Sequence, residues 1–466
     1  MNRYSNLYIL NLINEIEDKF PVDVWSVNEI KIWPLIRNSF CSSMLSKHRS
    51  IKLTKQTKIN KYINVIKLPF VAVIFITKLL MKILFKGECE VMYLSDGVSR
   101  MVFDKGYDKF CDPLHDTLSE KEPGIIGLYF SQLSFKDSQL RSKYTSLEIL
   151  HEISYFIARI YCKIIKIESL LPEYEDFLKF IDKHELESFY RKDIIVQNAI
   201  MIKICAFVFD LVIKLKKIKK SYIVCYYGIL GYALSLSSRK NDIDLYEIQH
   251  GTIVNCPAYH KWNKVPDDGY ALVPNKFLLW DDISVRTFNT ENSYNFTKIR
   301  TAEEFGLIPL KSKKIKSYIN NQAAEVLEIA KNFKAMIFVS LQPQFYGQND
   351  WDVLAEFIKK CNESYLWWIR PHVAYKDSFG LEKVSSLCGS NIFIDNGDYS
   401  IYSILDNAKL MITTASATVI ESCIYKIPSL LLSETGFEDF INYIDSGNAK
   451  YIKNKDRIND YIVSCL

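Results

Sequence analysis

Apolar and polar positions along this chain form two successive series of short strands and longer helices. In the first series, four apolar runs rich in β-branched and aromatic residues have the length of buried strands. These runs are Val91–Ser95, Ile125–Phe130, Tyr222–Tyr227 and Leu245–Gln249. Between them, residues 146–166 and 193–220 are apolar on a broad helical face. Such alternation predicts a parallel sheet covered by helices.

The alternation of strands and helices is interrupted over residues 290–316, which contain TENSYNFTK, a proline and the run KSKKIK. We predict that this segment connects two domains. The second series then places helices at 317–332 and 350–362 and one after Ser416. Its predicted strands are Ala335–Leu341, Tyr365–Arg370, Asn391–Asp395, Leu410–Thr414 and Pro428–Leu432. The pattern predicts an α/β protein with two doubly wound, Rossmann-like domains facing a cleft.

We place the domains at 1–300, which includes a basic amphipathic segment at 45–87, and at 301–466. The length of 466 residues suits two domains, and 48% apolar with 24% charged residues is an ordinary globular composition. A net charge of +5 is too small to indicate nucleic acid, and the lysine runs lack the interleaved aromatic residues that stack on bases.

The 11 cysteines include no C-x-x-C pair, which predicts free thiols in a reducing cytosol. The first twenty residues have apolar positions at helical spacing with acids between them, so we expect no cleaved signal peptide.

The stretch with the most uneven charge lies between Glu29 and Glu88, where basic residues recur without a single acidic residue. Within it, Leu68–Thr77 is too short to span a membrane, because a span needs about 20 apolar residues. A helix continuing from there would align three cations on one face, namely Lys78, Lys82 and Lys86. Such a helix either lies on an anionic membrane surface or packs its apolar side on the main domain. We predict the membrane as a partner.

Polar residues in the first half follow the predicted strand Leu245–Gln249. Gln249, His250 and Gly251 come where the strand ends, and a histidine there can transfer a proton. Gly251 would permit the tight turn. The nearby Asp267 and Asp268 form either a Pro-Asp-Gly turn or a general base for an acceptor hydroxyl.

Three strand ends of the second half also carry polar residues. Arg370 and His372 can reach a phosphate or a base, and Gln342 lies in the same predicted cleft. Thr414 ends the predicted strand Leu410–Thr414, and Ser416 can cap a helix whose N-terminus favours a phosphate. Thr418 and Glu421 follow on that helix, where the carboxylate can bond a ribose. Together these residues predict a nucleotide site.

The sequence lacks the motifs of several other enzyme classes. The sequence contains no G-x-G-x-x-G, Walker A or G-x-S-x-G motif, which disfavours a dinucleotide oxidoreductase, a P-loop enzyme and an α/β-hydrolase. Its histidines are isolated, so we predict no metal site and no cofactor beyond a nucleotide-sugar co-substrate.

The motifs YEIQHGT, IFVSLQP, WWIRPHV and ITTASATVIESCIYKIPSLLL resemble those of bacterial surface-polysaccharide glycosyltransferases of the GT-B architecture. The order Asp-Asp-Gly, then His beside Pro, then a Ser/Thr cluster is similar to sialyltransferases and Kdo transferases that use CMP-sugars. This resemblance implies that Asp268 or Asp267 is the base, that His372 contacts CMP, and that Ser416 and Thr418 contact its phosphate. The chain has Pro371 before His372, the reverse of the order in those families.

The resemblance implies a metal-independent transferase that moves a sugar, with CMP-Kdo as an example of the donor, to a lipid-linked or growing glycan. Capsule, O-antigen and lipopolysaccharide synthesis are the processes of this kind. The implied location is cytoplasmic and peripheral at the inner face of the bacterial membrane. A CDP-polyol phosphotransferase, whose relatives share Gln-His-Gly, a sugar-nucleotide epimerase and a non-catalytic glycan- or partner-binding protein of the same fold are the alternatives.

Overall fold

The computed structural model describes most of the chain. The described residues are 5–48, 77, 87–97, 107–134, 138–342, 354–356, 358, 363–372, 389–454 and 457–466. The predicted membrane helix with Lys78, Lys82 and Lys86 lies outside them, as does most of the predicted helix at 350–362. The chain divides into two compact units, the first comprising Arg3–Leu279 with Val285–Glu304 and the second comprising Trp280–Ser284 with Phe305–Leu466.

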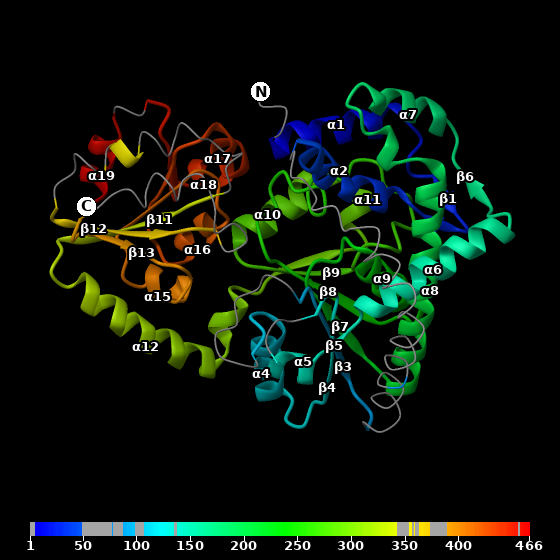
Figure 1. Ribbon diagram of the computed structural model, residues 1–466, viewed down its shortest axis with the longest axis horizontal. Helices are drawn as coiled ribbons and strands as arrows, with labels where there is room; N and C mark the ends of the chain where they lie inside the picture. The colour runs from blue at the N-terminus through cyan, green and yellow to red at the C-terminus, as the bar shows by residue number, and fades with distance from the viewer. Residues whose placement is uncertain are drawn as a thin grey trace, which may run out of the picture. The chain divides into compact units, whose positions relative to one another are not determined.

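The first unit is built on a parallel sheet (Figure 1). The described strands of this sheet follow the order β10-β9-β8-β7-β3-β4-β5. The strands are β3 (Val91–Ser95), β4 (Gly127–Ser131), β5 (Thr145–Ser146), β7 (Lys220–Ile223), β8 (Asp244–Ile248), β9 (Lys276–Leu279) and β10 (Thr301–Glu304). The order reverses beside β3, because β4 and β5 extend the sheet on one side and β7 to β10 on the other. Ligands of doubly wound sheets bind at the carboxyl ends of strands near such a point.

Helices and a small antiparallel sheet complete the first unit. The helices are α1 (Asn6–Lys19), α2 (Trp33–His48), α4 (Cys111–Lys121), α5 (Ser138–Lys143), α6 (Glu148–Ile164), α7 (Tyr174–Asp182), η1 (Glu187–Phe189), α8 (Lys192–Lys216), α9 (Ile229–Lys240), α10 (Asp282–Glu291) and α11 (Tyr294–Thr297). The small sheet pairs β1 (Ser26–Val27) with β2 (Ile30–Lys31) and β6 (Ser169–Leu170). Helices α1 and α2 share one continuous apolar core with the main sheet.

The second unit has its own parallel sheet, with described strands in the order β13-β12-β11-β14-β15-β16. These are β11 (Ala335–Ser340), β12 (Tyr365–Arg370), β13 (Ile392–Ile394), β14 (Leu410–Thr413), β15 (Ser429–Leu431) and β16 (Ala449–Tyr451). The helices are η2 (Ile308–Lys311), α12 (Lys313–Ala330), α15 (Ile401–Leu405), α16 (Thr418–Ile424), α17 (Glu434–Asp439), α18 (Ile441–Asp445) and α19 (Ile458–Cys465). The strand order reverses between β11 and β14.

Two parallel α/β units confirm the predicted fold class, and two details differ from the prediction. The segment predicted as a connection, 290–316, contains α11 and β10, and β10 pairs with β9 in the first sheet. The strand predicted to reach Tyr227 ends at Ile223. It ends there because Cys225 has a φ of 67°, a left-handed conformation that cannot continue a strand.

Candidate functional site

The carboxyl edge of the second sheet gathers the polar residues predicted for the donor. In the strand register, Ser340 lies opposite both Arg370 and Thr413. Gln342 and His372 therefore follow neighbouring strands at the same edge as Thr414. This edge is also the place where the strand order reverses, which is the usual ligand position in such sheets.

Arg370 at this edge lies between carboxylates. Its Nε lies 3.6 Å from Asp395 Oδ2, and both side chains are buried. Burial lowers the pKa of Arg370, while the nearby Asp395 and Glu421 act in the opposite direction. Asp395 is fixed in turn by the amides of Gly397 and Asp398, at 2.8 and 2.9 Å. Because Asp395 and Glu421 balance its charge, Arg370 is better suited to hold the carboxyl ends of the strands in place than to neutralise a phosphate.

The Ser/Thr cluster follows β14. Ser416 Oγ lies 2.9 Å from Thr418 Oγ1 and accepts a hydrogen bond from the Thr418 amide at 3.3 Å. Thr413 Oγ1 donates to the carbonyl of Ser340 at 2.9 Å, which ties β14 to β11. Thr414 is also fully buried, yet its hydroxyl has no hydrogen-bond partner among the described residues. A buried hydroxyl without a partner is unfavourable, and a water molecule or a ligand oxygen can satisfy it.

Three further predicted residues complete this edge. Partial burial lowers the pKa of His372, so the imidazole is favoured in its neutral form. Gln342 is buried and donates to the backbone carbonyl of Leu341 at 3.2 Å. Glu421 lies against Tyr402, whose phenol pKa is raised by burial and by this carboxylate. Asp395 and Tyr402 were not among the predicted site residues, although Asp395 ends a predicted strand.

The carboxyl edge of the first sheet carries His250. Its Nδ1 donates to the carbonyl of Ile248 at 3.0 Å, and its Nε2 lies 2.8 Å from the hydroxyl of Tyr227. With a carbonyl acceptor at Nδ1, the proton of the neutral ring belongs on that nitrogen, and Nε2 accepts from Tyr227. A carboxylate, Glu247, lies 3.4 Å from Nδ1 and is fully buried. His250 thus has the arrangement of a base whose ring is oriented by a backbone carbonyl, with a carboxylate nearby.

Glu247 and two tyrosines are site residues that the sequence analysis missed. Glu247 Oε1 accepts from the Tyr259 hydroxyl at 2.7 Å and from the Cys225 amide at 3.2 Å. Burial holds the pKa of both Tyr227 and Tyr259 well above the usual value, so both remain hydrogen-bond donors. The available signal was a charged residue inside the apolar run LYEIQ, since buried strands seldom contain an unpaired carboxylate.

Gln249 and Gly251, the sequence neighbours of His250, belong to the turn that follows β8. Gln249 is fully buried and donates to the carbonyl of Gly251 at 2.9 Å. A Cβ added at Gly251 would meet no atom within 4 Å, and its φ is not in the left-handed region. A side chain would therefore also fit at this position.

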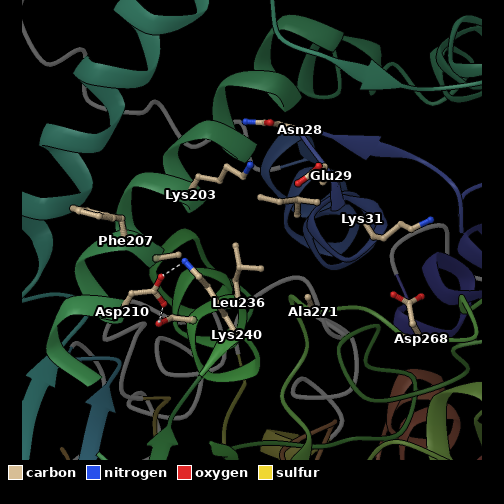
Figure 2. Close-up of a pocket in the computed structure, with 14 residues that line it drawn as sticks. Asn28, Glu29, Lys31, Lys203, Phe207, Asp210, Leu236, Lys240, Asp268 and Ala271 are labelled. Carbon is tan, nitrogen blue, oxygen red and sulfur yellow. Dashed lines mark hydrogen bonds and ion pairs between the residues drawn. The ribbon is translucent and has the colours of Figure 1, made fainter. Parts of the chain in front are cut away.

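The structure does not bring Asp267 and Asp268 into contact with His250. They form the Pro-Asp-Asp-Gly turn, in which the Gly269 amide donates to the Pro266 carbonyl at 2.8 Å with a φ of 70° at the glycine. Asp267 is 95% exposed and accepts from Asn295. Asp268 lines a separate cavity of about 530 Å³ with Lys240, which ends the helix before β8 (Figure 2). Lys240 precedes the amino end of β8, whereas His250 follows its carboxyl end.

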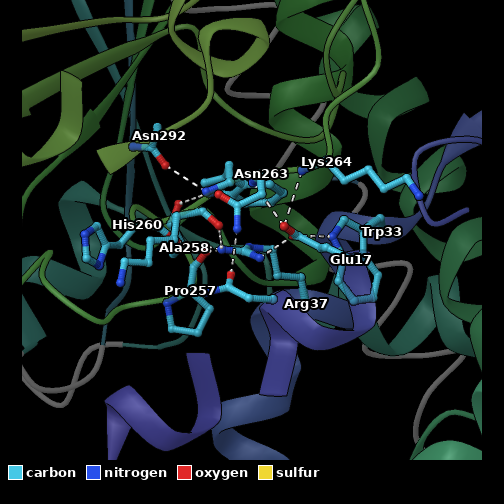
Figure 3. A network of polar contacts seen from close by, with 12 residues as sticks. Glu17, Trp33, Arg37, Pro257, Ala258, His260, Asn263, Lys264 and Asn292 are labelled. Atoms are coloured by element: carbon cyan, nitrogen blue, oxygen red, sulfur yellow. Dashed lines mark hydrogen bonds and ion pairs between the residues drawn. The ribbon is translucent and has the colours of Figure 1, made fainter. Parts of the chain in front are cut away.

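A buried ion pair in the N-terminal helices holds the loop that carries Tyr259 (Figure 3). Arg37 of α2 pairs with Glu17 of α1, and neither side chain is exposed. The guanidinium also donates to three loop carbonyls, those of Pro257, His260 and Lys261, at 3.0, 2.6 and 2.9 Å. Glu17 accepts from Trp33 Nε1 at 2.8 Å and from the loop amides of Asn263 and Lys264 at 3.0 and 3.3 Å. The pair therefore positions the loop whose Tyr259 contacts Glu247.

His260 in this loop makes the first unit sensitive to acid. Burial, with Lys261 and Arg37 nearby, lowers its pKa to about 3, and its Nδ1 accepts from the Asn255 amide at 2.9 Å. The unfolded chain binds a proton near pH 6.5 and the folded chain does not, so stability falls as pH drops from 6.5 towards 3. At pH 5 this amounts to about 2 kcal/mol relative to neutral pH.

His260→Asn keeps an acceptor for the Asn255 amide and removes the titration. We expect thermal unfolding of wild type to shift down more between pH 7 and pH 5 than that of the variant. His151→Asn, which changes an exposed histidine of α6, should follow the wild-type slope. Equal slopes for wild type and His260→Asn would contradict the assignment. Glu291, 3.9 Å from His260 Nε2, is the acid that a protonated ring would face.

Within the part of the chain that the structure describes, no group of three or more His, Cys, Asp or Glu side chains is close enough to hold a metal ion. The described residues include one helical stretch, Glu187–Lys216, that is long and apolar enough to cross a membrane, and half of its most apolar window is buried in the protein.

No family model matches the sequence, and no curated protein matches it. Solved structures to which the chain is similar include UDP-GlcNAc 2-epimerase from Neisseria meningitidis bound to UDP-GlcNAc, with 11% identity, a TM-score of 0.48, and coverage of 80% of this chain and 90% of that one. A putative UDP-N-acetylglucosamine 2-epimerase from Listeria monocytogenes has 12% identity, a TM-score of 0.48, and coverage of 81% and 88%. Phytolacca americana UGT2 complexed with UDP-2fluoro-glucose and pterostilbene has 8% identity, a TM-score of 0.42, and coverage of 80% and 87%.

Proposed function

We propose that this protein is a GT-B glycosyltransferase that moves a sugar from a nucleotide-sugar donor to a lipid-linked or growing surface polysaccharide. In this proposal the donor binds the second unit where β11 and β14 diverge, and the acceptor binds the first unit beside His250. The observation that carries it is the buried Thr414 hydroxyl without a partner in the described chain, at the strand edge where ligands of such sheets bind.

The residues around Thr414 suit a phosphate. Its hydroxyl, with those of Ser416 and Thr418, offers donors that need no metal, and a phosphate oxygen would satisfy the buried group. His372 follows β12, which is separated from β14 by β11, and adds a ring nitrogen at the same edge of the sheet. The order of the Asp-Asp-Gly motif, a His beside Pro (Pro371-His372) and the Ser/Thr cluster favours a CMP-linked sugar such as CMP-Kdo.

On the first unit, we assign the proton transfer to His250. A histidine with a carboxylate beside it can remove the proton of an acceptor hydroxyl as the donor bond breaks. The Tyr227 hydroxyl on Nε2 would be displaced by that acceptor or would relay the proton. Asp267 and Asp268 are the other base predicted from the sequence, but their place on an exposed turn favours His250. Acceptors for capsule, O-antigen or lipopolysaccharide would place the enzyme at the inner face of the bacterial cytoplasmic membrane.

A thermal-shift screen against CMP, CDP, UDP, GDP and ADP tests the donor. A nucleotide at about 100 times its Kd stabilises the state that binds it by about 2.7 kcal/mol, which raises Tm by several degrees. We expect the largest shift with CMP. A shift confined to UDP or GDP would support a transferase with a different nucleotide-sugar donor. A shift confined to CDP would favour polyol-phosphate transfer. No shift with any nucleotide would contradict the proposed nucleotide site.

Two adjacent threonines give a matched pair for the same assay. Thr414→Val removes a hydroxyl that has no partner in the described chain, so the ligand-free protein should be as stable as wild type or more so, while the nucleotide shift disappears. Thr413→Val removes the bond to Ser340 and should lower stability by about 1 kcal/mol while the shift persists. Ser416→Ala and His372→Ala should also reduce the shift. An unchanged nucleotide-induced Tm shift in Thr414→Val would contradict the assignment of Thr414 to the donor site.

A further inference from the structure

The cavity that Asp268 lines in the first unit has the size of a ligand site. Its volume of about 530 Å³ lies within the range of about 300–1,000 Å³ that small-molecule sites occupy. Helices α8 and α9, the β1–β2 hairpin and the turn at Gly269 form its wall. Figure 2 shows Asp210 and Lys240 on the side of this cavity away from Glu29.

The cavity wall carries equal numbers of positive and negative side chains. These are Lys31, Lys203, Lys240, Glu29, Asp210 and Asp268. Asp210 is already satisfied, because it accepts from Lys240 at 2.5 Å and from Ser237 at 2.6 Å. The other two carboxylates and two ammonium groups form no ion pair or hydrogen bond with a described residue. The wall therefore offers strong donors and acceptors together, without a net charge that would select an ion of one sign.

Glu29 occupies a backbone position that favours glycine. β1 and β2 pair with Val27 opposite Ile30, and the two residues between them, Asn28 and Glu29, have φ angles of 49° and 71°. Positive φ at both positions is the geometry of a type I′ turn, for which Asn-Gly is preferred because glycine has no Cβ. The hairpin thus holds a carboxylate at the cavity at a cost in backbone energy, and strained backbone of this kind concentrates at binding sites.

We propose that this cavity binds a saccharide. A sugar hydroxyl both donates and accepts, so it can pair with a free carboxylate or a free ammonium group without bringing a charge of its own. A small zwitterion would gain less, because Glu29 and Asp268 are exposed and ion pairs in water contribute little. Ala206, Phe207 and Leu236 line the same cavity and offer apolar surface to the C–H face of a sugar ring.

The cavity is separate from the proposed transfer chemistry. Lys240 precedes β8 and His250 follows it, and the ends of this five-residue strand are about 13 Å apart at roughly 3.3 Å per residue. A saccharide in the cavity therefore lies away from the proposed proton transfer. Its use, to hold one part of a growing glycan while the end of the chain reacts, rests on the proposed function, whereas the binding does not.

Binding of the full-length protein to an array of bacterial surface glycans tests the proposal. We expect wild type to bind glycans on the array, and calorimetry with the strongest of them gives the Kd. Glu29→Gly should raise this Kd at least tenfold, while its Tm should equal or exceed that of wild type because glycine relieves the positive φ. Lys203→Gln, which removes an ammonium donor, should raise the Kd several-fold.

Glu173→Gly is the matched control, because Glu173 is also exposed and has a φ of 59° but does not line the cavity. Its Tm should change in the same direction as that of Glu29→Gly, and its Kd should stay at the wild-type value. Thr414→Val should bind the glycan like wild type, so the result does not depend on the proposed donor site. No glycan bound by wild type, or an unchanged Kd in Glu29→Gly, would overturn the proposal. A Tm shift with free amino acids and no glycan binding would overturn it in favour of a zwitterion.

Discussion

Replacing Arg37 by methionine should lower the free energy of unfolding of the first unit by about 3–5 kcal/mol. The substitution leaves the carboxylate of Glu17 fully buried without its cation, and three loop carbonyls lose their donor. Burial already raises the pKa of Glu17, and loss of the guanidinium removes the main influence that lowers it. Denaturant unfolding followed by tryptophan fluorescence measures the loss.

Two variants make this result specific to the buried pair. Arg37→Met combined with Glu17→Met should recover part of the stability, because removing both charges costs less than leaving one unpaired. Arg191→Met breaks the exposed pair with Asp193 and should change stability by no more than about 1 kcal/mol. A loss in Arg37→Met no larger than in Arg191→Met would mean that the buried pair is not structural.

Much of the fold was predictable because buried parallel strands are continuous apolar runs. Val91–Ser95 and Tyr365–Arg370 were predicted at the bounds that the structure shows, since side chains on both faces of these strands are buried. β10 was missed because TAEE, at the sheet edge, has polar and mostly exposed side chains. A polar edge strand has no apolar pattern to distinguish it from a loop.

The two candidate sites were predictable to different extents. Thr414 and Arg370 stand directly at strand ends, so local pattern and strand register place them together. Contacts over long sequence separations leave no local signal, and Arg37 reaches the Pro257 carbonyl across 220 residues. The N-terminal third, which has no motif of its own, thus holds the loop of Tyr259.

His250→Ala should reduce turnover by about 10²–10⁴-fold while nucleotide binding stays intact. The substitution removes the ring that would take the acceptor proton, and it lies in the first unit, outside the proposed donor site. The measurement is release of nucleotide from the sugar donor whose nucleotide raises Tm, with a bacterial lipid extract as the acceptor source. The thermal shift of the same variant reports nucleotide binding.

The neighbours of His250 distinguish catalysis from packing. Glu247→Gln keeps an acceptor for Tyr259 and the Cys225 amide but removes the charge that would stabilise a protonated His250, so turnover should fall while Tm changes little. Asp268→Asn, on the distant turn, should leave turnover near wild type if His250 is the base. The reverse result, a large loss in Asp268→Asn with normal turnover in His250→Ala, would transfer the role of base to the Asp-Asp-Gly turn and leave His250 as a structural residue of the β8 edge.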